Sequence, residues 1–319
     1  MMNKRTLGKT KIKISPIGIG VMMWLGGKKG IWSRAPFITS EDKQTMIKVA
    51  FDGGINFFDT AEAYGFGRSE LSLVKALKAN NIEDEDVVIG TKWMPMFRWA
   101  RNMRRSINKR IKFLEDYTID LYMVHMLLSF STIKAQMNEM AKLVMNNKIR
   151  SVGVSNFSAN QMRKAQEVLE KHNIPLAVNQ VHYSLIRRNI ESNGILETAK
   201  ELGVTIVAYT PLGQGLLTGK YHSNPSLIDN KFSFFCRNIK KNLEKTKPLV
   251  EIMTEIGKKY DANPGQVALN WLISYSGDTV ITIPGTTKVN HIKESAGAMT
   301  FELSKSELKE ISEASMEFL

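Results

Sequence analysis

Short apolar runs alternate along the chain with longer stretches in which apolar and polar positions repeat with the period of a helix. The short runs are rich in β-branched residues and end at polar or glycine positions, which is typical of buried strands. The sequence predicts eight such strands, at residues 17–20, 55–58, 87–91, 121–124, 152–154, 176–179, 204–208 and 280–283.

The amphipathic stretches between these runs predict helices. Strands and helices in alternation indicate parallel strands, because each crossover must carry the chain back across the sheet. Eight strands with crossover helices close a cylinder, so we expect an α/β fold, a (β/α)8 TIM barrel. The predicted helices lie at residues 40–52, 69–79, 103–114, 131–145, 159–171, 190–202 and 265–275.

Two segments fall outside this alternation. Residues 4–15 predict a short N-terminal hairpin before the barrel, with its turn at Gly8 and Lys9. Residues 211–242, after the seventh strand, are irregular in pattern and predict a long loop. A loop of that length in a compact domain usually has a function.

Three helix starts carry residues that are typical caps. Ser69 precedes an acidic first turn, Ser158 precedes the helix at 159–171, and Asn263 stands before Pro264 at the start of 265–275. A side-chain oxygen at such a position accepts a hydrogen bond from an otherwise unpaired amide of the first turn. Proline fits the first turn because its missing N–H has no partner to lose there.

Composition narrows the class of protein. Of the 319 residues, 43% are hydrophobic and 24% are charged, which is typical of a globular chain and excludes a disordered one. No linker rich in proline, glycine or serine divides the chain, so we expect a single domain over residues 1–319. The one cysteine, Cys236, excludes an intrachain disulfide and a thiolate zinc cluster and indicates a reducing compartment, the cytoplasm. The N-terminus predicts no secretory signal, and no apolar run predicts a transmembrane helix.

The formal net charge of +13 would suit a nucleic acid, an anionic surface or an anionic cofactor. We favour a solvated helical face for the densest basic cluster, with a polyanion-binding patch as the alternative. No nucleic-acid-binding motif supports the alternative, so we expect neither nucleic acid nor membrane as a partner. The cluster consists of Arg98, Arg101, Arg104, Arg105, Lys109, Arg110 and Lys112.

Polar side chains gather where the predicted strands end. All carboxyl ends of the strands lie on one face of a parallel barrel, so residues far apart in the sequence meet there. Lys92 directly after a buried strand needs a partner, and Asp59 can supply it. An ammonium next to Tyr64 would lower the pKa of its hydroxyl below about 10, and His125 can donate a hydrogen bond to a carbonyl oxygen. This set holds no hydride source, so a cofactor must supply one.

Three longer motifs carry a family resemblance. They are GGINFFDTAEAYG at residues 53–65, KIRSVGVSNF at 148–157 and YTPLGQGLLTGK at 209–220. With these motifs in this order, the chain resembles the aldo-keto reductase superfamily over essentially its whole length. It is most similar to the branch that includes bacterial and archaeal reductases and the potassium-channel β subunits.

The resemblance implies NADPH-dependent reduction of aldehydes or ketones to alcohols. It implies a catalytic tetrad of Asp59, Tyr64, Lys92 and His125. In this tetrad Tyr64 protonates the carbonyl oxygen, Lys92 paired with Asp59 lowers the pKa of Tyr64, and His125 orients the substrate. A small-molecule carbonyl compound is therefore the expected partner, and the protein is expected to be a monomer or a homo-oligomer.

The resemblance also implies a set of cofactor-binding residues. Tyr209 would stack on the nicotinamide, residues 211–220 would wrap the diphosphate, and residues 284–295 would meet the adenosine-phosphate end at a helix start, which suits an anion. The full set is Asp59, Ser155, Asn156, Gln180, Tyr209, Thr210, Pro211, Leu212, Gly213, Gln214, Leu217, Lys220, Pro284, Gly285, Thr287, Lys288, His291, Glu294 and Ser295.

Two departures from the family pattern affect the site. The family often has arginine or glutamine at the position of His291, and usually asparagine at that of Ser295. A neutral histidine binds a 2′-phosphate less firmly than arginine does, although Thr287 and Lys288 can compensate, so NADP(H) is favoured over NAD(H). The second departure is one extra residue after the first strand, which leaves open whether Met22 or Trp24 lines the substrate pocket.

Other interpretations remain open at this stage. The chain could be a cofactor-binding regulatory subunit with slow redox turnover, or, less in keeping with the residues, a Schiff-base aldolase that uses Lys92. Trp93 and Trp99, with neighbouring methionines and Phe97, could line the substrate entrance or cover the barrel rim. We expect no metal site, because His172, His182, His222 and His291 lack the spacing of metal ligands.

Overall fold

The computed structural model describes residues 2–25, 37–228 and 233–319 of the chain. Eight parallel strands form a barrel in which each strand pairs with its neighbours in chain order, from β3 to β10. Bridges from Ile17 to Thr282 and from Gly20 to Gly285 link the first barrel strand to the last. The strands are β3 (Ile19–Gly20), β4 (Phe57–Asp59), β5 (Val88–Trp93), β6 (Leu121–Val124), β7 (Ser151–Ser155), β8 (Leu176–His182), β9 (Thr205–Tyr209) and β10 (Val280–Ile283).

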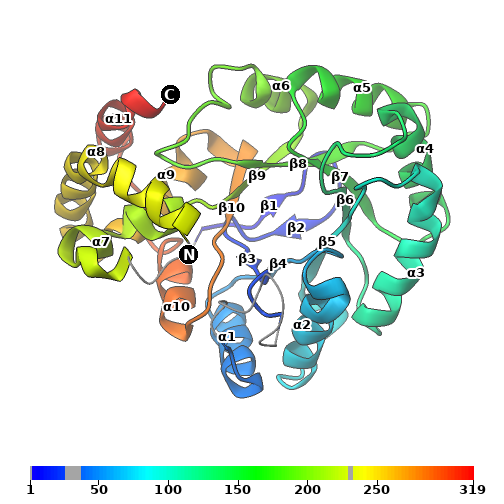
Figure 1. Cartoon of the computed structure of the whole chain (residues 1–319), viewed down its shortest axis with the longest axis horizontal. Coiled ribbons are helices and arrows are strands. Elements are labelled where there is room, and N and C mark those ends of the chain that lie inside the picture. The colour runs from blue at the N-terminus through cyan, green and yellow to red at the C-terminus, as the bar shows by residue number, and fades with distance from the viewer. Residues whose placement is uncertain (1, 26–36, 229–232) are drawn as a thin grey trace.

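The helices surround the strands, as Figure 1 shows. This arrangement confirms the predicted (β/α)8 barrel. The helices that connect successive strands are α1 (Ser40–Asp52), α2 (Arg68–Lys78), α3 (Met103–Leu114), α4 (Ile133–Met145), α5 (Ala159–Glu170), α6 (Ile195–Leu202) and α9 (Pro264–Ser274). The others are α7 (Lys220–Ser223), α8 (Ser233–Lys258), α10 (Val289–Gly297) and α11 (Lys305–Ala314).

The chain entering the barrel folds as the predicted hairpin. Strands β1 (Arg5–Thr6) and β2 (Lys13–Ile14) pair in antiparallel register, and Leu7, Ile12 and Ile14 are buried against apolar residues inside the barrel. Gly8 adopts φ +54°, and a Cβ there would stand 2.6 Å from the carbonyl oxygen of Ala177. Only glycine fits so close to the start of β8. The hairpin therefore lies against the end of the barrel at which the strands begin, and its apolar side chains fill that end.

Alternation along the strands decides which side chains face the barrel interior. Phe57, Val88, Leu121 and Met123 form one inner cluster with residues of the hairpin, whereas their neighbours in sequence pack against the helices. Every second residue of a strand faces the same side, so the inward positions of β4 and β5 include Asp59 and Lys92, and His125 directly after β6 continues the same alternation. The fold thus brings these three polar residues to the open end of the same cylinder.

Several boundaries differ from the predictions. Ser158 and Asn263 cap their helices as expected, but Ser69 lies inside α2, whose N-cap is Gly67. The Ser69 hydroxyl instead donates to the carbonyl oxygen of Val21 at 2.8 Å, which ties α2 to the segment after β3. The predicted helix at 190–202 begins only at Ile195.

The predicted loop at 211–242 is largely helical. It contains two short 3-10 segments, Gly213–Thr218 and Pro225–Ile228, with α7 between them, and α8 already begins at Ser233. Leu217 of this segment packs into the barrel core, whereas Leu216, Tyr221, Ile228 and Ile239 form a separate small apolar cluster. Neither contact follows from a periodic pattern in the sequence.

The basic cluster is not wholly a solvated face. Arg110 is only 2% exposed and forms an ion pair with the buried Glu70 at 2.7 Å. Arg104 pairs with Glu139, also at 2.7 Å. Those two arginines therefore hold α3 to its neighbouring helices, while Arg101, Arg105, Lys109 and Lys112 are exposed to solvent. In the described ranges, no helix has the length and apolar character needed to cross a membrane.

Candidate active site

A buried ion pair stands at the open end of the barrel. The Asp59 Oδ2 atom lies 2.6 Å from Lys92 Nζ, and both side chains are almost completely inaccessible to solvent. The same ammonium donates to the carbonyl oxygen of Thr60 at 2.7 Å. Because Asp59 ends β4 and Lys92 lies near the end of the adjacent β5, parallel pairing alone is enough to bring them together.

Tyr64 and His125 complete a cluster around this pair. Lys92 Nζ lies 5.1 Å from the centre of the Tyr64 ring, and its charge acts on the pKa of the Tyr64 hydroxyl. The Tyr64 ring meets the His125 ring edge to face, with 5.7 Å between centroids. The structure therefore brings together all four residues of the predicted tetrad.

The charge on Lys92 is stabilised where it lies. Burial by itself would lower the pKa of Lys92, but the Asp59 carboxylate and the Tyr64 hydroxyl outweigh it and raise the pKa above its ordinary value. An ammonium held in this way is a poor amine nucleophile. The geometry consequently gives no support to the Schiff-base aldolase alternative.

The pKa of Tyr64 corrects a prediction from the sequence. We expected Lys92 to make this phenol more acidic, and its charge does act in that direction. Burial acts more strongly and raises the pKa of Tyr64 above 10. The extent of burial cannot be read from a loop sequence, and its consequence is a phenol that is harder to deprotonate than a free tyrosine.

His125 is neutral in this environment. Burial, with a smaller contribution from the nearby Lys92 ammonium, lowers the pKa of His125 to about 3. Its Nδ1 atom is buried and has no hydrogen-bond partner among the described residues. A neutral imidazole with an unsatisfied ring nitrogen beside Tyr64 is suited to a polar ligand in the barrel mouth.

We expect this burial to make the fold sensitive to acid. The unfolded chain binds a proton on His125 near pH 6.5, whereas the folded chain binds it only near pH 3, so the free energy of unfolding should fall as pH is lowered through this window. His125→Asn should remove part of that fall. Urea denaturation at pH 7, 5.5 and 4.5 measures both slopes, and equal slopes would contradict the buried neutral state of His125.

A chain of hydrogen bonds leads from Asp59 on β4 across the barrel mouth to β8, β7 and β9. Gln180 Nε2 donates to Asp59 Oδ1 at 2.8 Å, and Ser155 Oγ donates to the Gln180 carbonyl oxygen at 3.0 Å. Asn156 Nδ2 donates to Ser155 Oγ, and its Oδ1 accepts from the Tyr209 hydroxyl, each at 3.0 Å. These four predicted cofactor residues therefore form one polar wall, with the half-buried Tyr209 ring at its far end.

His182 also belongs to this wall, although the sequence did not predict it as a site residue. Its ring stacks on that of Tyr209, with 5.1 Å between centroids and 25° between planes. It lies two positions after Gln180 on β8 and therefore points to the same side of the sheet. The alternation of the strand would have placed His182 on the same face as Gln180. It was not applied to His182 because the strand was predicted to end at residue 179.

The segment after β9 has an unusual backbone. Thr210, Gly213, Gln214 and Gly215 all have positive φ angles, which turn the chain sharply around the barrel mouth. Gln214 Oε1 is buried and has no hydrogen-bond partner among the described residues. Of the other predicted residues here, Pro211 and Leu217 are buried, and Leu212 and Lys220 are half-buried. Leu217 packs into the core, so its side chain cannot contact a ligand at the surface.

The remaining predicted cofactor residues surround the start of α10. A Cβ on Gly285 would meet no described atom within 4 Å, so open space lies beside the backbone after β10. Lys288 is the N-cap of α10 but does not cap it with its side chain. Ser295 is occupied within the helix, where its hydroxyl donates to the His291 carbonyl oxygen at 2.8 Å. The set at this end of the site is Pro284, Gly285, Thr287, Lys288, His291, Glu294 and Ser295.

Comparison with models of known protein families agrees with this geometry. The family model described as "Aldo/keto reductase family" matches residues 16–316. The chain belongs to the aldo/keto reductase family. Members of this family are oxidoreductases that use nicotinamide cofactors.

Curated relatives and a solved structure show the same similarity. The chain is 33% identical over 317 residues to the probable aldo-keto reductase 1 of Glycine max, which covers 97% of this chain and 87% of that protein. It is 32% identical over 293 residues to the aldo-keto reductase yakc of Schizosaccharomyces pombe, whose name specifies NADP(+), with 86% and 83% covered. A thermostable aldo-keto reductase solved with the inhibitor epalrestat superposes with a TM-score of 0.77 at 28% identity, covering 98% of this chain and 100% of that one.

Trp93 does not contribute to the entrance of this aldo-keto reductase. It is fully buried on the outer side of β5, and its indole donates to Asn102 Oδ1 at 3.3 Å. Phe97 and Trp99 are exposed and both pack on Phe130. The two loops that follow β5 and β6 thus carry a shared aromatic surface, joined by a hydrogen bond from the Phe97 amide to the Leu128 carbonyl oxygen.

The structure also separates Met22 from Trp24. Trp24 is completely buried, and its indole donates to the carbonyl oxygen of Thr286 at 3.2 Å. Met22 remains 39% exposed. Met22 is therefore the one of the two that can contact a ligand in this aldo-keto reductase.

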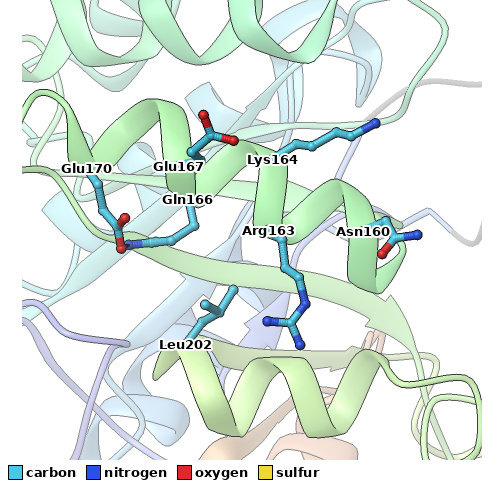
Figure 2. Close-up of a pocket in the computed structure, with 7 residues that line it drawn as sticks. All are labelled: Asn160, Arg163, Lys164, Gln166, Glu167, Glu170 and Leu202. Atoms are coloured by element: carbon cyan, nitrogen blue, oxygen red, sulfur yellow. Dashed lines mark hydrogen bonds between the residues drawn. The ribbon is translucent and has the colours of Figure 1, made fainter.

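A hollow of about 450 Å³ lies away from the tetrad, on the outer helical layer. Figure 2 shows it beside α5, with Arg163 pointing toward α6. Arg163 forms two hydrogen bonds with Glu201, and Gln166 donates to Glu170. The first pairing joins α5 to α6 and the second lies within α5, so these polar side chains are already paired with one another and the hollow is better described as a helix contact than as a ligand site. Across the described part of the chain, no three His, Cys, Asp or Glu side chains gather as a metal site would require.

Proposed function

We propose that this protein reduces aldehydes or ketones to alcohols, with NADPH as the favoured hydride donor and Tyr64 as the general acid. One observation carries the proposal. The Lys92 ammonium is buried against the Asp59 carboxylate at 2.6 Å and lies 5.1 Å from the centre of the Tyr64 ring, at the open end of the barrel. Families with this fold place their chemistry at that end.

The residues around the barrel mouth fit a dinucleotide. Ser155, Asn156, Gln180 and Tyr209 would hold the nicotinamide, residues 210–220 the diphosphate, and residues 284–295 the adenosine end. The half-buried Tyr209 ring, the unsatisfied Gln214 Oε1 and the open space beside Gly285 support this assignment. The cofactor, when bound, supplies the hydride that the protein itself lacks.

The four clustered side chains would divide the remaining work. His125, being neutral, would donate a hydrogen bond to the carbonyl oxygen of the substrate and orient it. Tyr64 would give its proton to the same oxygen as negative charge develops there. Lys92 would stabilise the tyrosinate that remains, and Asp59 would hold the ammonium in place while keeping the buried pair neutral overall.

The preference for NADPH rests on the start of α10. Lys288 precedes this helix, whose first amides lack a side-chain cap, and both features favour a phosphate. The name of the Schizosaccharomyces pombe relative includes NADP(+). His291 stands in the first turn of the same helix, where a neutral ring adds less than arginine would.

We expect His291→Arg to tighten NADPH about tenfold and to leave NADH nearly unchanged. The arginine would add a charge-assisted hydrogen bond to the 2′-phosphate, which NADH lacks, and a factor of ten corresponds to about 1.4 kcal/mol. Titration of each cofactor by quenching of protein fluorescence measures the two dissociation constants. Equal tightening of both would show that position 291 does not face the 2′-phosphate.

The function itself is tested by turnover. Purified protein is mixed with NADPH and a panel of carbonyl compounds headed by 4-nitrobenzaldehyde, and loss of NADPH absorbance is followed. Tyr64→Phe serves as the control, because it removes one oxygen and leaves the ring. NADPH binding without oxidation by any compound of the panel would favour the regulatory-subunit alternative over the reductase.

A further inference from the structure

One buried carboxylate attaches the loop of Tyr64 to the strand of Lys92. Glu62 lies two residues before Tyr64 and is 8% exposed. Its Oε2 atom accepts hydrogen bonds from the Met94 amide and from the Ser106 hydroxyl, each at 3.0 Å. Its Oε1 atom accepts from Arg98 Nη1 at 2.8 Å.

The backbone continues this attachment. Beyond the end of β4, the Thr60 amide donates to the Gly90 carbonyl oxygen at 2.8 Å, and the Glu62 amide donates to the Lys92 carbonyl oxygen at 3.1 Å. The Glu62 side chain accepts a hydrogen bond from the amide of Met94, which lies two residues after Lys92. The main chain of Glu62 therefore holds the loop at Lys92, and its side chain holds the loop at Met94.

Arg98 connects Glu62 to a second part of the barrel mouth. Its carbonyl oxygen accepts hydrogen bonds from the Phe130 amide at 3.0 Å and from the Ser129 hydroxyl at 2.8 Å. Its guanidinium is about one-third exposed, whereas the Glu62 side chain is buried. The ion pair thus joins the loops after β4, β5 and β6 at one carboxylate.

We propose that Glu62 is a positioning residue for proton transfer, which sets the separation between the Tyr64 hydroxyl and the Lys92 ammonium. This inference rests on the proposed reductase function. Glu62 touches neither of the two reacting groups and acts through the loop that carries Tyr64. Catalysis is sensitive to such placement, because an error of about 1 Å can cost on the order of a hundredfold in rate.

The chain contains a matched control at the other end of β5. Asp120 is buried, at 1% exposed against 8% for Glu62, and it also accepts hydrogen bonds from one backbone amide and one arginine. Its partners are the Ile89 amide at 2.8 Å and Arg150 Nη1 at 2.7 Å. The carboxylate lies near the start of β5 and β6, away from Tyr64, so its loss should affect stability without moving the tyrosine loop.

The test compares Glu62→Gln, Arg98→Met and Asp120→Asn in the full chain. In Glu62 both side-chain oxygens accept hydrogen bonds, which come from Arg98, Met94 and Ser106. In Glu62→Gln one of these oxygens is replaced by an NH2 group, which donates hydrogen bonds and cannot accept them. We expect its kcat to fall about ten- to a hundredfold, with the dissociation constant of NADPH unchanged within about twofold. Arg98→Met should lower kcat about three- to tenfold, and the double variant should be no slower than Glu62→Gln alone.

A kinetic isotope effect identifies the step that slows. With NADPH deuterated at the transferred position, the isotope effect on kcat should rise in Glu62→Gln, because chemistry then limits turnover more completely. Asp120→Asn should keep the kcat and isotope effect of the unmodified protein, even where its melting temperature falls. A structural role alone would move melting temperature and kcat together in both variants.

The inference is overturned if Glu62→Gln and Asp120→Asn lower kcat to the same extent, or if the isotope effect stays constant while kcat falls. If Glu62→Gln fails to bind NADPH, Arg98→Met decides, since its exposed arginine can be replaced with less damage to the core. Failure of the proposed function is distinct: the unmodified protein would then oxidise no NADPH with any carbonyl compound, and the inference would fall with it.

Discussion

Tyr64→Phe should lower the rate of carbonyl reduction by about a thousandfold and leave NADPH affinity within about twofold of the unmodified protein. The substitution removes one hydroxyl from a ring that is held by contact with His125 and lies beside Lys92. The residues assigned to the nicotinamide, Ser155, Asn156, Gln180 and Tyr209, belong to β7, β8 and β9 or follow them directly, so their positions should not change.

The decisive measurements are kcat and the cofactor dissociation constant on the same preparation. A rate close to that of the unmodified protein would remove Tyr64 from the mechanism. Loss of both rate and cofactor binding would instead indicate a disturbed barrel mouth. The raised pKa of Tyr64 adds a further expectation: any loss of reduction that comes from deprotonation of this phenol should have its midpoint above about pH 10, the ordinary pKa of tyrosine.

Lys92→Met should abolish reduction and also lower the free energy of unfolding by about 3–5 kcal/mol. Methionine fills the space of the lysine stem, but Asp59 is left as a buried charge with Gln180 as its remaining side-chain donor. The double variant Asp59→Asn with Lys92→Met removes both charges and should recover most of the lost stability while remaining inactive.

Urea denaturation at pH 7 and at pH 4.5 tests this expectation. The deficit of the single variant should shrink at the lower pH, since protonation of Asp59 removes the buried charge. Equal stability of the single and double variants would show that Asp59 is not stabilised mainly by Lys92.

The barrel could be predicted because its strands repeat as short apolar runs between amphipathic helices. The same pattern placed strand ends too early wherever the last inward residues are polar. Strand β5 extends beyond the predicted residue 91 to Trp93, and β8 beyond residue 179 to His182. Polar residues at these ends interrupt an apolar run without ending the strand, and that is why His182 was missed.

The sequence predicted most residues of the candidate site, but it did not predict the direction of the Tyr64 pKa shift. Position after a strand was enough to nominate Lys92 and His125, and motifs supplied the residues around Tyr209. The direction of the Tyr64 pKa shift was wrong, because burial outweighs the charge of Lys92. The contacts of Glu62 with Met94, Arg98 and Ser106 join three segments that no local pattern relates.

The hairpin that fills one end of the barrel has a consequence for the order of events. With Leu7, Ile12 and Ile14 packed there, molecules can approach Tyr64 from one side only. A dinucleotide and a carbonyl compound must then share a single route, so whichever lies deeper has to arrive first and depart last. We expect the nicotinamide to be the deeper of the two, which makes release of the spent dinucleotide wait for the alcohol to leave.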